Sequence, residues 1–201
     1  DAAGAAQARR EAAERLGVNP EAPTLLVTGG SLGALHVNES MTGAADALPE
    51  GAQVVHLTGR GKDEPVRAAV EAAGCSDRWH VIDYLTTMED ALAVADLVVC
   101  RSGAGTVAEM EALGLPCIYV PLPIGNGEQR LNAADHVAAG GAQLIDDKDF
   151  TADFVRSNVF PLLGSARLAD MAAASQSLGR AGAARALADL ALEQVKESGH
   201  E

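Results

Sequence analysis

The chain has 201 residues, which is enough for one large domain or two small ones with a substantial core. Hydrophobic residues make up 48% and charged residues 21%, as in soluble globular proteins rather than disordered, collagen-like or disulfide-dense chains. The formal net charge of −13 argues against nucleic acid as a partner, because that binding requires lysine and arginine to neutralise phosphates. No window reaches the about 18 uninterrupted apolar residues of a membrane span, and we expect no signal peptide.

Short apolar runs alternate with amphipathic stretches along most of the chain. After an alanine-rich helix ending near Leu16, six segments of strand length follow, at residues 24–28, 53–57, 79–82, 97–100, 117–120 and 143–145. Helices are predicted to begin near Ala34, Asp63, Met88, Thr106 and Gln129, and beyond Thr151 only helices follow, through Leu163, from Ala166 to Leu178 and from Gly182 to about Glu197. This alternation predicts an α/β fold, a Rossmann-like doubly wound parallel sheet of about six strands with a helical C-terminal tail.

Nothing in the sequence indicates a metal site. Cys75, Cys100 and Cys117 lie far apart without a CxxC motif, and we interpret them as reduced core thiols at strand-like positions of a cytosolic protein. The five histidines have no ligand spacing. The D-x-D pattern at residues 147–149 follows the last predicted strand, where a polar turn and helix cap is a better interpretation than a cation site. We therefore expect no metal and no cofactor.

Three glycine-rich loops follow the first, fourth and fifth predicted strands, at residues 28–34, 101–106 and 121–129. In a doubly wound sheet, ligands bind beyond the carboxyl ends of the strands, where these loops enter helices. The first loop, GGSLGA, lacks the G-x-G-x-x-G spacing of dinucleotide-binding proteins. Its Ser31 is either a helix N-cap or a phosphate donor.

The second loop opens a helix at Gly103-Ala104-Gly105-Thr106, so free backbone amides face whatever binds above the fourth strand. Glu109 follows by one turn, either as a first-turn carboxylate stabilised by the helix dipole or as an acceptor for the two hydroxyls of a ribose. Glu111 is expected to be a solvated surface acid. Arg101 either neutralises a phosphate or pairs with a neighbouring acid.

The third loop ends at Glu128 and Gln129, an acid and an amide side by side. They either hold the hydroxyls of a sugar or are ordinary first-turn helix residues. Asn132, one turn later, is either a packing amide or a residue that staples loops by a hydrogen bond.

In this order and spacing, the three loops resemble the carboxyl-terminal half of the MurG-type transferases. The matching stretches are TGGSLGALHVNESM from Thr28, CRSGAGTVAEMEALGLPCIYVPLP from Cys100 and NGEQRLNAADHVAAGGA from Asn126. Members of this family transfer N-acetylglucosamine from UDP-N-acetylglucosamine to lipid I, which makes lipid II for peptidoglycan. The resemblance implies the carboxyl-terminal, donor-binding domain of the GT-B fold.

The resemblance also implies roles for particular residues. Ser31 and the amides around Gly30 would contact the diphosphate, and the backbone of Leu85 would hold uracil. Ala104, Gly105 and Thr106 would line the diphosphate and sugar. Glu109 would accept the ribose hydroxyls, and Glu128 and Gln129 would hold the N-acetylglucosamine hydroxyls. Relatives often have leucine where this chain has Gly105, and two glutamines where it has Glu128 and Gln129.

The family's amino-terminal half binds the lipid acceptor, carries the catalytic base and contacts the inner face of the cell membrane, and 201 residues cannot hold both halves. We therefore expect a cytoplasmic chain that binds the donor, has no catalytic residue of its own and is inactive alone. Its predicted parts are a helical lead-in at 1–22, the UDP-sugar-binding domain at 23–164 and helices at 165–201 packed on it or on the amino-terminal domain. The alternatives are the donor domain of another GT-B transferase and a non-catalytic nucleotide-sugar binding module.

Overall fold

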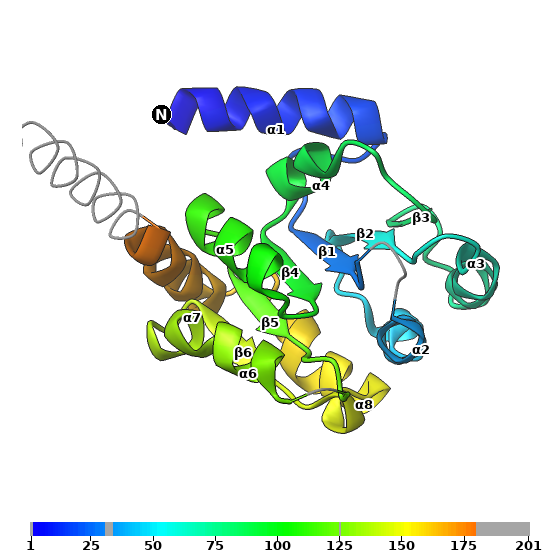
Figure 1. Ribbon diagram of the computed structural model, residues 1–201. Coiled ribbons are helices and arrows are strands. Elements are labelled where there is room, and N and C mark those ends of the chain that lie inside the picture. Colours follow the sequence, from blue (N-terminus) through cyan, green and yellow to red (C-terminus); the bar gives the residue numbers. More distant parts are fainter. Residues whose placement is uncertain (1, 31–33, 125, 180–201) are drawn as a thin grey trace, which may run out of the picture.

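The computed structural model describes residues 2–30, 34–124 and 126–179 (Figure 1). Its centre is one parallel sheet of six strands in the order β3-β2-β1-β4-β5-β6. The strands are β1 (Thr24–Thr28), β2 (Gln53–Leu57), β3 (Trp79–Ile82), β4 (Leu97–Cys100), β5 (Cys117–Tyr119) and β6 (Ala142–Leu144). The chain winds outward in both directions from β1 and β4, so the predicted doubly wound, Rossmann-like fold is confirmed.

The helices connect these strands much as the sequence predicts. They are α1 (Ala2–Leu16), α2 (Leu35–Thr42), α3 (Asp63–Ala72), α4 (Met88–Val94), α5 (Ala104–Leu113), α6 (Glu128–Asn132), α7 (Ala134–Ala138) and α8 (Ala152–Phe154). A π-helical turn (Val155–Val159), a 3-10 turn (Phe160–Leu162) and a helix described over residues 166–179 follow. α5 begins at Ala104, two residues before the predicted start near Thr106, because the backbone is extended only as far as Gly103. The helix predicted from Gly182 lies outside the described residues.

Both faces of the sheet are covered at its centre, which explains why a central strand such as β4 is apolar throughout rather than alternating. In β1, Leu25 and Val27 belong to a core with α2, α3 and residues 150–171. Leu26 points to the opposite core, which contains residues of α1, α4 and α5. All five residues of β1 are buried, as expected for a central parallel strand between two helical layers.

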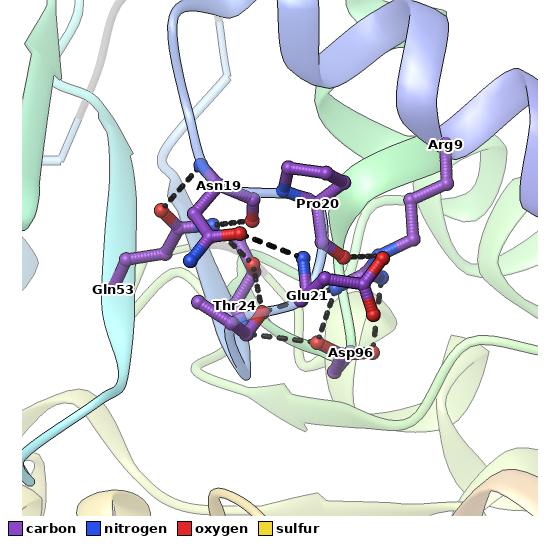
Figure 2. Close-up of polar contacts among 8 residues, drawn as sticks. Arg9, Asn19, Pro20, Glu21, Thr24, Gln53 and Asp96 are labelled. Carbon is purple, nitrogen blue, oxygen red and sulfur yellow. Dashed lines mark hydrogen bonds and ion pairs between the residues drawn. The ribbon is translucent and has the colours of Figure 1, made fainter.

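The first helix is attached to the amino-terminal ends of the strands (Figure 2). The guanidinium of Arg9 donates to both carboxylate oxygens of Asp96, at 3.0 and 2.9 Å, and to the carbonyl of Pro20 at 2.8 Å. Asp96 also accepts a hydrogen bond from the Thr24 amide at 2.8 Å, and Gln53 donates to the Asn19 carbonyl at 2.6 Å. These bonds hold α1 and the segment after it against the end of the sheet that faces away from the glycine-rich loops.

The helix at residues 166–179 packs on the same domain through a buried polar chain. The Ser175 hydroxyl donates to the Gly141 carbonyl at 3.2 Å and lies 2.8 Å from Nε2 of His136. Since that hydroxyl proton is already committed, Nε2 carries the imidazole proton, and Nδ1 accepts from the Tyr119 hydroxyl at 2.9 Å. This chain of bonds joins β5, α7 and the C-terminal helix.

Candidate functional site

A cavity of about 590 Å³ lies at the carboxyl ends of the strands. It is lined from the loops after β1, β2, β3, β4 and β5, and five of the predicted site residues line it: Gly30, Leu85, Thr106, Glu109 and Gln129. Another cavity, of about 660 Å³, lies at the opposite end of the sheet, between α1 and residues 164–172. Because ligands of doubly wound sheets bind at the carboxyl edge, the first cavity is the candidate site.

The first glycine-rich loop enters this cavity at Gly30, whose φ of +82° lies in the left-handed region that favours glycine. Its amide donates to the Thr28 hydroxyl at 3.3 Å. Ser31, for which the sequence predicts either a cap or a phosphate contact, lies outside the described residues. The described chain resumes at Ala34, directly before α2.

A buried network that the sequence analysis missed attaches α2 to the neighbouring strand. Asn38 donates from Nδ2 to the Thr58 carbonyl at 3.0 Å, and its Oδ1 lies 2.8 Å from Nε2 of His56. Because Trp79 Nε1 donates to His56 Nδ1 at 3.2 Å, the imidazole proton is on Nε2 and points to Asn38. Burial lowers the pKa of His56 to about 3, so the ring is neutral. The sequence signal that could have indicated this network is Asn38, a polar residue three positions after the start of α2 at Leu35.

The N-terminus of α5 faces the same cavity without a side-chain cap. Gly103 is the N-cap residue and lines the cavity, with an extended backbone and no side chain to accept from the helix amides. Ala104 and Gly105 in the first turn are exposed, and Thr106 is half-buried against the cavity. Unsatisfied amides and the positive end of the helix dipole make this turn an anion-binding feature.

Glu109 lies on the second turn of α5, not the first, so the interpretation as a first-turn dipole carboxylate is wrong. Its side chain is exposed at the cavity and has no hydrogen bond or ion pair with any residue the structure describes. A carboxylate in this position can accept two hydrogen bonds from a ligand.

Glu111 also departs from expectation, because it is half-buried rather than solvated. Burial raises the pKa of its carboxyl, and the nearby Asp135 adds a smaller effect in the same direction.

For Arg101, the structure decides between the two alternatives in favour of an acidic partner. Its guanidinium forms an ion pair with Asp147 and donates to the carbonyls of Val120 at 3.1 Å and Pro121 at 3.2 Å. The first aspartate of the D-x-D pattern is therefore a partner of arginine. Thr151, not that pattern, caps the next helix, by accepting from the Phe154 amide at 3.2 Å.

Gln129 joins two loops through one oxygen. Its Oε1 accepts from the Leu122 amide at 2.9 Å and from the Ser102 amide at 3.3 Å. Since both partners are N–H donors, the amide oxygen must face them, which leaves the NH₂ group for a ligand. Glu128 is exposed and lines an adjoining cavity of about 490 Å³ that Gln129 also lines.

Asn132 is a loop-stapling residue, one of the two alternatives that the sequence left open. Its Nδ2 donates to the Ser102 carbonyl at 3.0 Å.

In the described part of the chain, no group of three or more histidine, cysteine, aspartate or glutamate side chains is placed to hold a metal ion. The cysteines are free and buried; Cys100 and Cys117 lie in strands, whereas Cys75 follows α3.

The sheet order and a loop-built site at the carboxyl edge define a Rossmann-like α/β domain of the kind found as the carboxyl-terminal half of GT-B glycosyltransferases. The sequence model described as "Glycosyltransferase family 28 C-terminal domain" matches residues 24–190. The chain belongs to this family.

Curated relatives support the resemblance to MurG-type transferases. A protein of Paenarthrobacter aurescens is 47% identical over 197 residues, covering 97% of this chain and 52% of the relative. One of Bifidobacterium adolescentis is 49% identical over 168 residues, covering 77% and 43%. Both are named "UDP-N-acetylglucosamine--N-acetylmuramyl-(pentapeptide) pyrophosphoryl-undecaprenol N-acetylglucosamine transferase". The chain spans about half the length of these relatives.

A solved structure agrees with this assignment. The crystal structure of MurG from Acinetobacter baumannii superposes with a TM-score of 0.69 at 27% identity, covering 83% of this chain and 48% of that one. WaaG, a glycosyltransferase of lipopolysaccharide biosynthesis, has the same fold with a TM-score of 0.64 at 18% identity.

Proposed function

We propose that this chain is the donor-binding half of an inverting transferase that moves N-acetylglucosamine from UDP-N-acetylglucosamine to lipid I, forming lipid II. The proposal depends chiefly on one observation: a single cavity contains the N-terminus of α5, the Glu109 carboxylate, which has no partner among the described residues, and the amide of Gln129. These are the groups that a diphosphate, a ribose and a sugar require. The names of the curated relatives support the choice of donor and acceptor.

Each part of the donor has a proposed partner. Gly30 and Ser31 contact the diphosphate together with the first turn of α5, at Ala104, Gly105 and Thr106. Glu109 accepts both ribose hydroxyls, and the backbone of Leu85 holds uracil. Glu128 and Gln129 hold the N-acetylglucosamine hydroxyls. The two differ in role, because Gln129 has only its NH₂ group to offer and so donates, whereas Glu128 accepts.

The proposed reaction is a direct displacement at the anomeric carbon. The acceptor oxygen forms its bond to this carbon as the bond to the UDP oxygen breaks, and the acceptor's proton passes to a base in the amino-terminal half. The amides of the first turn of α5 stabilise the negative charge that develops on the departing UDP. This chain therefore binds and orients the donor without completing the reaction alone.

The lipid acceptor and the membrane are partners of the complete enzyme through its amino-terminal half, which acts at the cytoplasmic face of the cell membrane. Within the described residues, none of the helices combines the length and apolar character needed to cross a bilayer.

Calorimetric titration of the 201-residue chain tests the proposal. We expect UDP and UDP-N-acetylglucosamine to bind in the micromolar to millimolar range, with GDP at least about tenfold weaker, and no transfer to lipid I. No heat at millimolar UDP would reject the donor-binding role. Binding of other UDP-sugars as tightly as UDP-N-acetylglucosamine would favour another GT-B transferase, and turnover by this chain alone would reject the half-enzyme role.

A further inference from the structure

The peptide backbone of Ser102 is held from both sides by the side chains of one short helix. Its amide donates to Oε1 of Gln129 at 3.3 Å, and its carbonyl accepts from Nδ2 of Asn132 at 3.0 Å. Gln129 and Asn132 are three residues apart on α6, so they lie on the same side of that helix. Through these two hydrogen bonds, α6 holds the loop that leads from β4 into α5.

The side chain of Ser102 contributes nothing comparable to this attachment. Ser102 is fully buried, yet its hydroxyl has no hydrogen-bond partner among the described residues. Within this network the position of Ser102 is set through its backbone, by the two amides of α6.

The loop beyond Ser102 needs external support, because it has little packing of its own. Gly103 is the N-cap of α5 and Gly105 is in its first turn, and a Cβ built on either residue would meet no other atom within 4 Å. Val107 packs in the core and anchors the helix behind this turn, but neither glycine has a side chain that packs, and glycine allows the backbone more freedom than other residues do. The direction of the first amides of α5 therefore depends on what holds Ser102.

Asn132 is placed to act only through that loop. It lines neither the cavity at the carboxyl edge nor the adjoining one, whereas Gln129 lines both. We propose that Asn132 is a positioning residue for the diphosphate contact: by holding the Ser102 carbonyl, it aims the first-turn amides of α5 at the phosphates. This inference rests on the proposed function and adds a residue with no ligand contact of its own.

The test compares variants of Asn132 in the 201-residue chain. Asn132→Ala removes the donor, and we expect UDP affinity to fall about three- to tenfold, the effect of one lost hydrogen bond. Asn132→Asp keeps the shape but turns a carboxylate oxygen toward the Ser102 carbonyl, so it should weaken binding at least as much. Asn132→Gln keeps a donor and should recover part of the affinity. Asn158→Ala is the matched control. Asn158 also donates from Nδ2 to a backbone carbonyl, that of Phe154 at 3.3 Å, but it is exposed and lines neither cavity.

Amide hydrogen exchange separates positioning from general stability. We expect the amides of Ser102 and Val107, which are hydrogen-bonded at the loop and in the first turn of α5, to exchange faster in Asn132→Ala, while that of Val99 in β4 is unchanged. Unaltered UDP affinity in this variant would overturn the inference, as would faster exchange throughout the domain. No UDP binding by the wild-type chain would instead overturn the proposed function, and this role with it.

Discussion

Arg101, which follows β4, and Asp147, which follows β6, form an ion pair in which each side chain is only 15% exposed. The same guanidinium holds the carbonyls of Val120 and Pro121, at the start of the loop after β5. One cation thus links the carboxyl ends of three strands beside the candidate cavity. Asp147 neutralises its charge within the protein.

Removing one partner of this pair should destabilise the fold strongly. We expect Asp147→Ala to lower the free energy of unfolding by about 1–3 kcal/mol, because it leaves a largely buried guanidinium with only the two carbonyls as partners. The double variant Arg101→Met with Asp147→Ala should lose less than the two single variants together. Urea unfolding measures all three, and additive losses would show that the two charges do not interact appreciably.

Glu109→Ala should weaken UDP binding about ten- to a hundredfold, since it removes two charge-assisted hydrogen bonds worth roughly 1.5–3 kcal/mol. Glu109→Gln should fall between wild type and alanine. The melting temperature should stay close to that of wild type, because Glu109 has no partner among the described residues to lose. Glu111→Gln, two residues along and outside the cavity, is the control. A Glu109→Ala variant that binds UDP like wild type would contradict the ribose contact.

Gly141→Ala should destabilise the attachment of the C-terminal helix. A Cβ at this position would lie 2.3 Å from the Ser175 hydroxyl and 2.7 Å from Nε2 of His136, so the hydrogen-bonded chain must shift. We expect a loss of about 3 kcal/mol or more, at or above the usual cost of overpacking. Gly105→Ala, where a Cβ meets nothing within 4 Å, should leave thermal stability equal or higher. Equal melting temperatures for both variants would contradict the packing described.

Acid should destabilise the chain through three histidines whose pKa values are lowered in the folded state. Burial lowers the pKa of His56 from 6.5 to about 3 and also lowers the pKa values of His80 and His136. Below about pH 6.5 the unfolded chain takes up protons on these histidines more readily than the folded chain does. The free energy of unfolding should therefore fall toward pH 4, by up to about 1.4 kcal/mol per pH unit for His56, with further losses in the same direction from His80 and His136. Above about pH 7 they are neutral in both states and add no pH dependence.

Urea unfolding from pH 7 to 4.5 measures this slope, and His56→Gln should reduce it. A slope unchanged in His56→Gln would show that His56 titrates normally in the folded chain.

The aspartates with arginine partners affect the free energy of unfolding in a lower pH range. The pKa values of Asp46, Asp63 and Asp90 are lowered chiefly by hydrogen bonds from Arg156, Arg67 and Arg15, so their stabilisation is present above about pH 4 and is lost only below it.

The strands could be predicted closely because both faces of the sheet are buried. A continuous apolar run such as residues 97–100 is of strand length and is predicted as a buried strand once polar residues bound it, and β1 to β4 have the predicted limits. The helix starts were less certain. Glycine has no side chain to cap a helix and is a weaker start signal than serine or aspartate, so α5 begins two residues before the predicted position near Thr106, and Glu109 lies in the second turn rather than the first.

By itself the sequence determined the fold class and the three loops that build the candidate site, because strand order and crossover handedness bring the carboxyl ends of parallel strands to one edge. The partners of single side chains were decided only by the tertiary structure. Arg101 meets Asp147, Asn132 meets Ser102, and His56 meets Trp79 across sequence separations that no local pattern encodes. The physical reason is that a polar group chooses its partner after burial, among the groups that the packed sheet happens to bring within reach.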